Sequence, residues 1–207
     1  MTATKQAADG RAGVEGNRRL TAALGLLLLV MLAVEGVTVL DVRGMLTLHM
    51  FLGLMLIPPV LFKSATTSYR FARYYRGAAP YVEKGPPHLV LRLLGPVVVL
   101  SSVALLGTGL VLILVGSGQR DTWLTLHQGS FIVWLAAMTI HVLGHVLEAA
   151  RVSAGELRRD RFTRGRGVRM VAVALALLAG VGLATALWPE QHSASTSGFH
   201  DSGSDDH

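Results

Sequence analysis

The stretch that decides the fold is WLTLHQGSFIVWLAAMTIHVLGHVLE, which runs from Trp123 to Glu148. It is apolar and long enough to cross a bilayer as one helix, since about 20 such residues span the hydrocarbon core. It also carries His127, His141 and His145. Histidine is costly inside hydrocarbon and usually faces a bundle interior with a partner. The stretch therefore predicts a membrane-spanning helix with a functional face.

The spacing of these histidines is informative. At about 100° per residue, all three lie within roughly 40° of one line along the helix. His127 and His141 are separated by about 14 residues, which is a rise of about 21 Å. One imidazole is therefore expected near each side of the membrane, with both directed to the same side of the helix. Because neutral imidazole is a common axial ligand of haem iron, the pattern favours haem binding.

The composition indicates a polytopic membrane protein. Of the 207 residues, 51% are hydrophobic and 15% are charged, and the apolar residues lie in long blocks. The chain has no cysteine, which excludes disulfides, thiolate-held iron–sulfur clusters and thiol catalysis. The formal net charge is +6, but the basic residues lie in short segments between apolar blocks. That placement fits membrane lipid as the partner and argues against nucleic acid.

The apolar blocks predict an all-α membrane protein with five transmembrane helices. The first block lies at 20–40 and is too long for a typical signal peptide. The second starts near residue 45 and contains Pro58 and Pro59, which should kink its helix. The predicted organisation is a disordered cytoplasmic tail at 1–19, a four-helix transmembrane haem-binding core at 20–150, a basic cytoplasmic loop at 151–169, a fifth transmembrane helix at 170–188 and a disordered extracytoplasmic tail at 189–207.

Lysine and arginine predict the orientation of the chain. The N-terminal tail, residues 63–92 and the 151–169 loop are strongly basic, whereas the other two loops contain only Arg43 and Arg120. By the positive-inside rule the N-terminus is cytoplasmic and the C-terminus is outside. The expected location is the bacterial cell membrane, which the chain crosses several times.

This topology places His49 and His127 at the same depth near the outer side. Two level histidines on different helices can occupy the two axial faces of one haem b. Gly53 follows His49 by one turn and Gly129 lies close to His127, so both are expected to leave room for a porphyrin ring. The alternative is that both histidines bond to core neighbours and that Gly53 serves helix packing.

A second haem near the inner side stays open at this point. A two-haem bundle would place another histidine on the second helix near position 63, which is Lys63. His88 is then the remaining partner for His141 or His145. These last two are also an i, i+4 pair that can chelate zinc or copper on one helix face.

Glu35 is the ionisable group inside the first predicted span. It can orient His49 as a hydrogen-bond acceptor or carry protons. Snorkelling of its carboxylate to the interface is the simpler expectation.

Parts of the chain resemble an actinobacterial multi-pass membrane protein family that is similar in style to bacterial b-type cytochrome subunits of hydrogenases and formate dehydrogenases. The resemblance covers about residues 20–150. It implies a haem-binding four-helix core with His49, His127 and either His141 or His145 at the histidine positions. The segments that carry it are LHMFLGLMLIPPVLFKSATTSYRFARYYRG (48–77), KGPPHLVLRLLGPVVVL (84–100) and LHQGSFIVWLAAMTIHVLGHV (126–146).

These patterns favour a membrane b-type cytochrome-like protein, which is an electron-transfer subunit more than a self-contained enzyme. It would relay single electrons through one or two haem b groups and exchange them with quinone or a redox partner subunit. One alternative is a cofactor-free permease or metal-ion transporter that uses the histidine stripe. Another is a structural or regulatory membrane subunit whose histidines only pack.

Overall fold

The computed structural model describes residues 2–82, 89–158 and 166–200, with side chains described at 13–82, 93–144 except 117, and 167–195. These residues form helices joined by short turns and contain no strand. Five helices are long and apolar enough to cross a membrane, as the sequence predicts. The spans are Gly13–Leu40, Leu46–Tyr75, Leu93–Leu114, Arg120–Gly144 and Gly167–Ala186.

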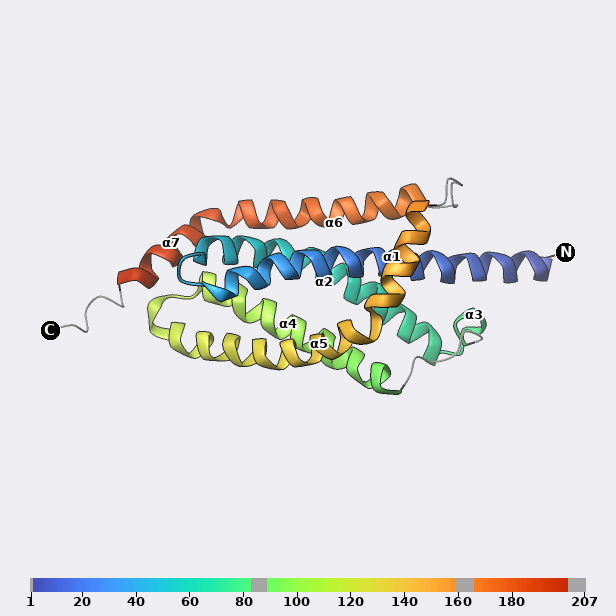
Figure 1. Cartoon of the computed structure of the whole chain (residues 1–207), viewed down its shortest axis with the longest axis horizontal. Helices are drawn as coiled ribbons and strands as arrows, with labels where there is room; N and C mark the ends of the chain where they lie inside the picture. Colours follow the sequence, from blue (N-terminus) through green and yellow to red (C-terminus); the bar gives the residue numbers. More distant parts are fainter. Residues whose placement is uncertain (1, 83–88, 159–165, 201–207) are drawn as a thin grey trace.

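Figure 1 shows the order and arrangement of the helices. Large apolar side chains such as Leu100, Ile132 and Leu178 remain more than half exposed on the helix surfaces, which suits contact with lipid. The elements are α1 (Thr2–Leu40), α2 (Leu46–Tyr75), α3 (Ala79–Val82), α4 (Leu89–Leu114), the 3₁₀ turn η1 (Ser117–Gln119), α5 (Arg120–Arg158), α6 (Arg166–Ala186) and α7 (Trp188–His200).

Four of the membrane-spanning helices, α1, α2, α4 and α5, pack into a ring. α1 contacts α2 and α5, and α4 contacts the same two helices, so α2 and α5 lie diagonally opposite one another. The fifth span, α6, packs along α2 on the outside of the ring (Figure 1). Gly180 of α6 lies so close to α2 that an added Cβ would collide with the carbonyl oxygen of Met55. The absence of a side chain at this position therefore allows the two helices to meet.

The two ends of the bundle differ. One end carries the turn between α1 and α2, the connection from α4 to α5, and α7; we call it the turn end (Figure 1). The other carries the start of α1, α3, the end of α5 and the start of α6; we call it the basic end because of its arginines. The backbone N–H of Gly44 donates to Asp41 Oδ1 at 3.1 Å and tightens the turn between α1 and α2.

The structure differs from the prediction at the N-terminal tail. Residues 2–19 were expected to be disordered, but they are the first part of the continuous helix α1. Arg19 Nε donates to Glu15 Oε1 at 3.0 Å across one helical turn, and alanines add helix propensity. The predicted basic loop likewise begins later than expected, because α5 continues to Arg158.

The C-terminal tail also differs from the prediction of disorder, since residues 188–200 form α7. Gln191 is fully buried, and its Nε2 donates to the carbonyl oxygen of Ala184 at 2.6 Å. Arg120 at the start of α5 donates to the carbonyl oxygen of Ala194 at 3.0 Å. These bonds hold α7 against the turn end of the bundle, where it contacts α2 and α4.

The kink expected in the second span is visible in the path of α2. Pro58 and Pro59 lie inside this helix, and Figure 1 shows it changing direction part-way along its length. Proline removes a backbone hydrogen bond and crowds the preceding turn. Pro59 is buried in the bundle, so neighbouring helices support the bend.

Candidate functional site

The first half of the site is the contact between His49 of α2 and the last turns of α1. His49 Nδ1 lies 2.9 Å from Glu35 Oε1 and 2.9 Å from Thr38 Oγ1. The Thr38 hydroxyl donates its own proton to the backbone carbonyl oxygen of Glu35 at 2.6 Å, so it acts as an acceptor toward the imidazole. An ionised carboxylate only accepts hydrogen bonds. The proton of neutral His49 is therefore assigned to Nδ1.

The second half is the contact between His127 of α5 and α4. His127 Nδ1 lies 3.2 Å from the carbonyl oxygen of Leu105 and 3.1 Å from Thr108 Oγ1. A carbonyl oxygen only accepts, so Nδ1 again carries the proton. Gly109 gives the ring its space, because an added Cβ would lie 3.1 Å from His127 Cε1.

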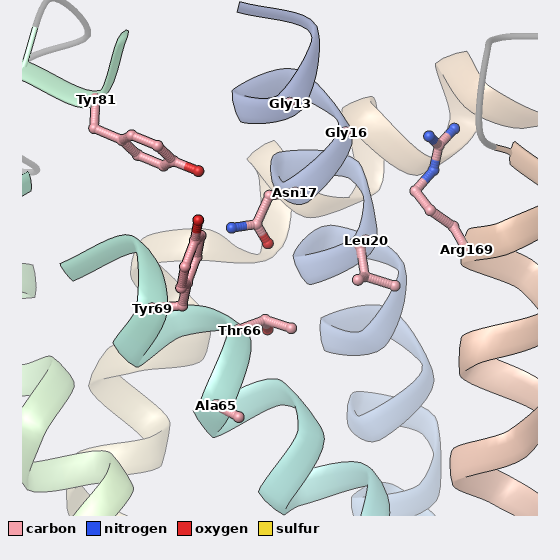
Figure 2. Close-up of a pocket in the computed structure, with 9 residues that line it drawn as sticks. All are labelled: Gly13, Gly16, Asn17, Leu20, Ala65, Thr66, Tyr69, Tyr81 and Arg169. Atoms are coloured by element: carbon pink, nitrogen blue, oxygen red, sulfur yellow. The ribbon is translucent and has the colours of Figure 1, made fainter. Parts of the chain in front are cut away.

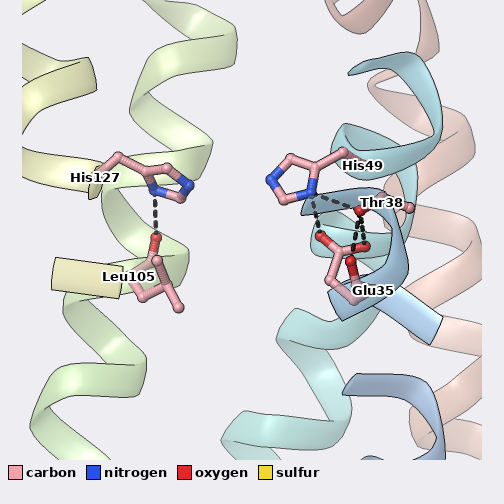
Figure 3. A network of polar contacts seen from close by, with 5 residues as sticks. All are labelled: Glu35, Thr38, His49, Leu105 and His127. Atoms are coloured by element: carbon pink, nitrogen blue, oxygen red, sulfur yellow. Dashed lines mark hydrogen bonds and ion pairs between the residues drawn. The ribbon is translucent and has the colours of Figure 1, made fainter. Parts of the chain in front are cut away.

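The two imidazoles face each other across the bundle from diagonal helices. Their ring centroids are 6.5 Å apart and their planes are inclined at 78°. Figure 3 shows that the ring nitrogen of each histidine not engaged by α1 or α4 points toward the other ring. With Nδ1 protonated on both, these facing nitrogens are the unprotonated Nε2 atoms. The site thus presents two lone pairs toward one point between the helices.

This arrangement has the dimensions of a two-imidazole metal ligand set. A metal–imidazole bond is about 2 Å, so two rings on opposite sides of one metal place their centroids about 6 Å apart. Ligand imidazoles also characteristically donate their other N–H to a carboxylate or carbonyl, which fixes tautomer and orientation. Both histidines satisfy that requirement. The residues present therefore fit a group that takes two imidazole nitrogens, and His49 and His127 would hold it; haem iron is one such group.

Glu35 corrects one expectation from the sequence. Its carboxylate was expected to snorkel to the interface, but its side chain is 13% exposed and pairs with His49, which is itself 22% exposed. Burial of an acidic group in a membrane bundle requires such a partner. Of the other two roles considered for Glu35, this contact favours that of an acceptor that orients His49.

The two glycines expected to leave room for a porphyrin lie in different surroundings. A Cβ at Gly53 would come within 3.6 Å of Glu35 Oε1, so this glycine lies beside the acceptor of His49. A Cβ at Gly129 would meet nothing within 4 Å. Neither glycine is therefore required by a close contact with a neighbouring side chain.

Of the residues considered for the inner side, the structure describes the side chains of Lys63 and His141. Lys63 Nζ donates to the carbonyl oxygen of Thr21 in α1 at 3.3 Å. His141 is partly buried on α5, about 21 Å along the helix from His127. His145 lies in the same helix, but its side chain is outside the described part, as is the whole of His88. The inner haem and the His141–His145 chelate thus remain predictions.

A site built from several protein ligands is not found in the described part of the chain. There, no group of three or more His, Asp or Glu side chains is placed to hold a metal ion.

Several residues of the site escaped the sequence reasoning. No sequence motif marks the hydrogen-bond acceptors of the two histidines or Gly109. The short turn at 41–45 is the one feature of the sequence that could have indicated the acceptors on α1. In an antiparallel hairpin, residues equally distant from the turn lie side by side, so Glu35 and Thr38 fall opposite the start of α2. The residues missed as site members are Thr38, Leu105, Thr108 and Gly109.

Comparison of the chain with protein-family models, with curated protein sequences and with solved structures finds no significant match. The function is therefore inferred from the geometry of the histidine pair.

Proposed function

We propose that this membrane protein binds one haem b between His49 and His127 and serves as an electron-transfer subunit. The observation that carries the proposal is the opposition of two Nε2 lone pairs, with ring centroids 6.5 Å apart, each imidazole oriented by an acceptor at Nδ1. When bound, haem supplies reversible one-electron transfer at its iron.

The protein's own groups have distinct roles in this proposal. His49 and His127 would bind the cofactor from α2 and α5, which lie diagonally opposite in the ring. The cofactor would therefore link these two helices. Glu35 accepts the His49 N–H and makes that imidazole a stronger donor. The Leu105 carbonyl and Thr108 hydroxyl hold His127 in the matching tautomer. The surrounding apolar helices exclude water and lower the local dielectric.

The acceptors of the two Nδ1–H groups, Glu35 and the Leu105 carbonyl, differ in charge, and this difference affects the reduction potential of a bound haem. Glu35 is anionic, and a negative charge beside an axial ligand stabilises the oxidised, more positive state of the cofactor site. Leu105 contributes only a neutral carbonyl dipole. In this proposal Glu35 is therefore the principal residue by which the protein lowers the reduction potential.

We also propose that the turn end faces the outside and the basic end faces the cytoplasm. The spans favour this orientation because arginine and lysine concentrate at one end of the bundle. The haem would then lie near the outer face of the cell membrane, and electrons would be exchanged with quinone or with a redox partner subunit there.

The test is the visible spectrum of detergent-purified protein from haem-replete cells, with a pyridine haemochrome assay for stoichiometry. We expect a Soret band, reducible α and β bands and about one haem per chain. A protein that carries no haem after reconstitution with hemin would contradict the proposal. The histidine-stripe transporter and the structural subunit would then be the surviving alternatives, and metal-uptake assays would separate them.

A further inference from the structure

The two opposed imidazoles belong to different hairpins, and the chain joins these hairpins at the basic end. His49 lies in the hairpin α1–α2, and His127 lies in the hairpin α4–α5. The chain passes from one to the other between the end of α2 and the start of α4, both of which lie at the basic end (Figure 1). The turns at the opposite end connect helices within a hairpin. The separation of the imidazoles therefore depends on noncovalent contacts between the hairpins at the turn end.

The helix α7 makes such contacts with both hairpins. Its first residue, Trp188, meets Phe51 of α2 edge to face, with ring centroids 6.2 Å apart. Further along α7, the carbonyl oxygen of Ala194 accepts a hydrogen bond from Arg120 of α5 at 3.0 Å. Phe51 lies within one turn of His49, and Arg120 begins α5 about two turns before the second histidine. At the turn end α7 thus connects the two helices that carry the histidines.

The junction of α6 and α7 fills the seam between the hairpins. Leu54 of α2, Ile113 of α4 and Ala184 of α6 form a buried apolar cluster, with exposed fractions of 9% or less. Because interiors are close-packed, a shift of α6 or α7 at this point changes the packing of α2 against α4. The side chains that pack against the cluster include Phe51, Leu110 and Leu187.

The side chain of Gln191 fixes the angle between α6 and α7. It is fully buried, and its Nε2 donates to the carbonyl oxygen of Ala184 at 2.6 Å. Ala184 lies in the last turn of α6, where carbonyl oxygens lose their helical partners. The backbone N–H of Gln191 donates to the carbonyl oxygen of Leu187 at 3.1 Å. One residue of α7 is therefore bonded both to the end of α6 and to the residue that joins the two helices.

The packing of the fifth span differs along its length. At the basic end a pocket of about 570 Å³ lies between α1, α2, α3 and the start of α6, with Tyr69 and Arg169 in its lining (Figure 2). Toward the turn end, Gly180 meets the backbone of Met55 and Ala184 is fully buried. Close packing of α6 against the hairpins is therefore found toward its α7 end, which is the end nearer the histidine pair.

We propose that α7 is a strap that sets the separation of the His49 and His127 imidazoles, with Gln191 and Arg120 as the positioning residues that hold it. With α7 docked, the hairpins stay together at the turn end and both imidazoles face one point. With α7 released, the hairpins separate at this end and the two rings no longer reach the same group. Where it concerns haem, this inference rests on the proposed function, because both imidazoles must reach one iron.

The first measurement is the distance between α2 and α5, which needs no cofactor. The chain has no cysteine, so Leu48→Cys and Leu124→Cys place two spin labels on exposed positions of these helices. Double electron–electron resonance compares this labelled chain with the same chain carrying Gln191→Met, which keeps the volume but removes the amide donor. The variant should shift the distance distribution upward by about 2 Å, the size of a helix shift within a bundle. Gln119→Met, at an exposed glutamine of the turn end, is the matched control and should leave the distribution unchanged.

The second measurement is the electron paramagnetic resonance spectrum of the ferric protein reconstituted with hemin. Two axial imidazoles give low-spin ferric haem, whereas a single imidazole gives the high-spin form. Gln191→Met and Arg120→Gln should each raise the high-spin fraction by about fivefold, as expected for the loss of one hydrogen bond that holds α7. Arg43→Gln removes an exposed arginine from the same end and should keep the wild-type spectrum.

The two measurements separate the failure of this inference from the failure of the haem proposal. If the chain takes up no hemin but Gln191→Met gives the longer distance, the haem proposal is wrong and the strap is supported. Unchanged distances in Gln191→Met would overturn the strap with or without haem. A longer distance together with an unchanged low-spin spectrum would also overturn it, because α7 would then not set the separation of the imidazoles.

Discussion

The two ends of the bundle use the same diagonal pair of helices in different ways. At the turn end, α2 and α5 present His49 and His127 with ring centroids 6.5 Å apart. About 14 residues further along each helix, α2 presents Lys63 and α5 presents His141. Lys63 donates to Thr21 of α1 at 3.3 Å. The same spacing along α2 and α5 therefore places a polar side chain on each helix near both ends. At the turn end these side chains are two imidazoles that face each other, whereas at the basic end Lys63 bonds to α1.

The difference also shows how the fold orients a histidine side chain on a helix. His49 and His127 each belong to one antiparallel hairpin, α1–α2 or α4–α5, and take their Nδ1 acceptors from the other helix of that hairpin. The hairpin therefore fixes the tautomer, and the diagonal packing of two hairpins brings the two imidazoles together. Substitutions at each end of the bundle test this difference.

The largest effect is expected from removal of either opposed imidazole. His49→Ala and His127→Ala should each abolish haem retention, because one axial ligand is lost and the apolar site offers no replacement. The measurement is the ratio of haemochrome to protein after purification. His141→Ala is the control on the same helix as His127 and should keep about one haem per chain. Full haem content in both His49→Ala and His127→Ala would refute the pairing.

A smaller effect is expected from substitution of Glu35, the carboxylate that accepts the hydrogen bond of His49. Glu35→Gln keeps a hydrogen-bond acceptor but removes the negative charge, so haem affinity should fall by about 10- to 100-fold. The reduction potential should rise, on the order of 50 mV, because the oxidised state loses electrostatic stabilisation. Hemin titration and redox potentiometry measure the two quantities. Glu15→Gln, at the basic end of the same helix, should change neither.

The space around His127 gives a third and weaker test. In Gly109→Ala the new methyl group would lie 3.1 Å from His127 Cε1, so the ring must move from its acceptors. Haem affinity should fall several-fold, as expected for a displaced ligand. Gly107→Ala is the matched control two residues away, where an added Cβ meets nothing within 4 Å. Equal haem titrations for the two variants would show that Gly109 does not position the ring.

Much of the fold could be predicted from the sequence, because a long apolar block has one favourable conformation in a bilayer, which is a membrane-spanning helix. The five spans, the interior prolines of α2 and the level placement of His49 and His127 all come from block length, spacing and loop charge. The ends of the chain were less predictable. The helices at 2–19 and 188–200 lack apolar periodicity, and α7 is held by the fully buried Gln191 and by Arg120, which are tertiary contacts.

The residues of the candidate site likewise fall into those that the sequence predicted and those that it did not. The histidines were found because an imidazole inside an apolar helix is conspicuous. The acceptors were harder to find because a backbone carbonyl such as that of Leu105 has no sequence signature. Glu35 was visible, but snorkelling and pairing have the same sequence pattern. Only the register of α1 against α2 distinguishes them, and it places Glu35 Oε1 2.9 Å from His49 Nδ1.

The smallest effect is expected at the basic end, and it bears most directly on the comparison. Lys63→Met removes the hydrogen bond to Thr21, but it also removes a charge that is costly to keep within a membrane span. The two changes oppose each other, so the free energy of unfolding should change by about 1 kcal/mol or less. Haem stoichiometry and the reduced spectrum should stay those of the wild type, since Lys63 is held by α1. If instead the wild type holds two haems and Lys63→Met holds one, the basic end contains a second site, and the contrast between the two ends is wrong.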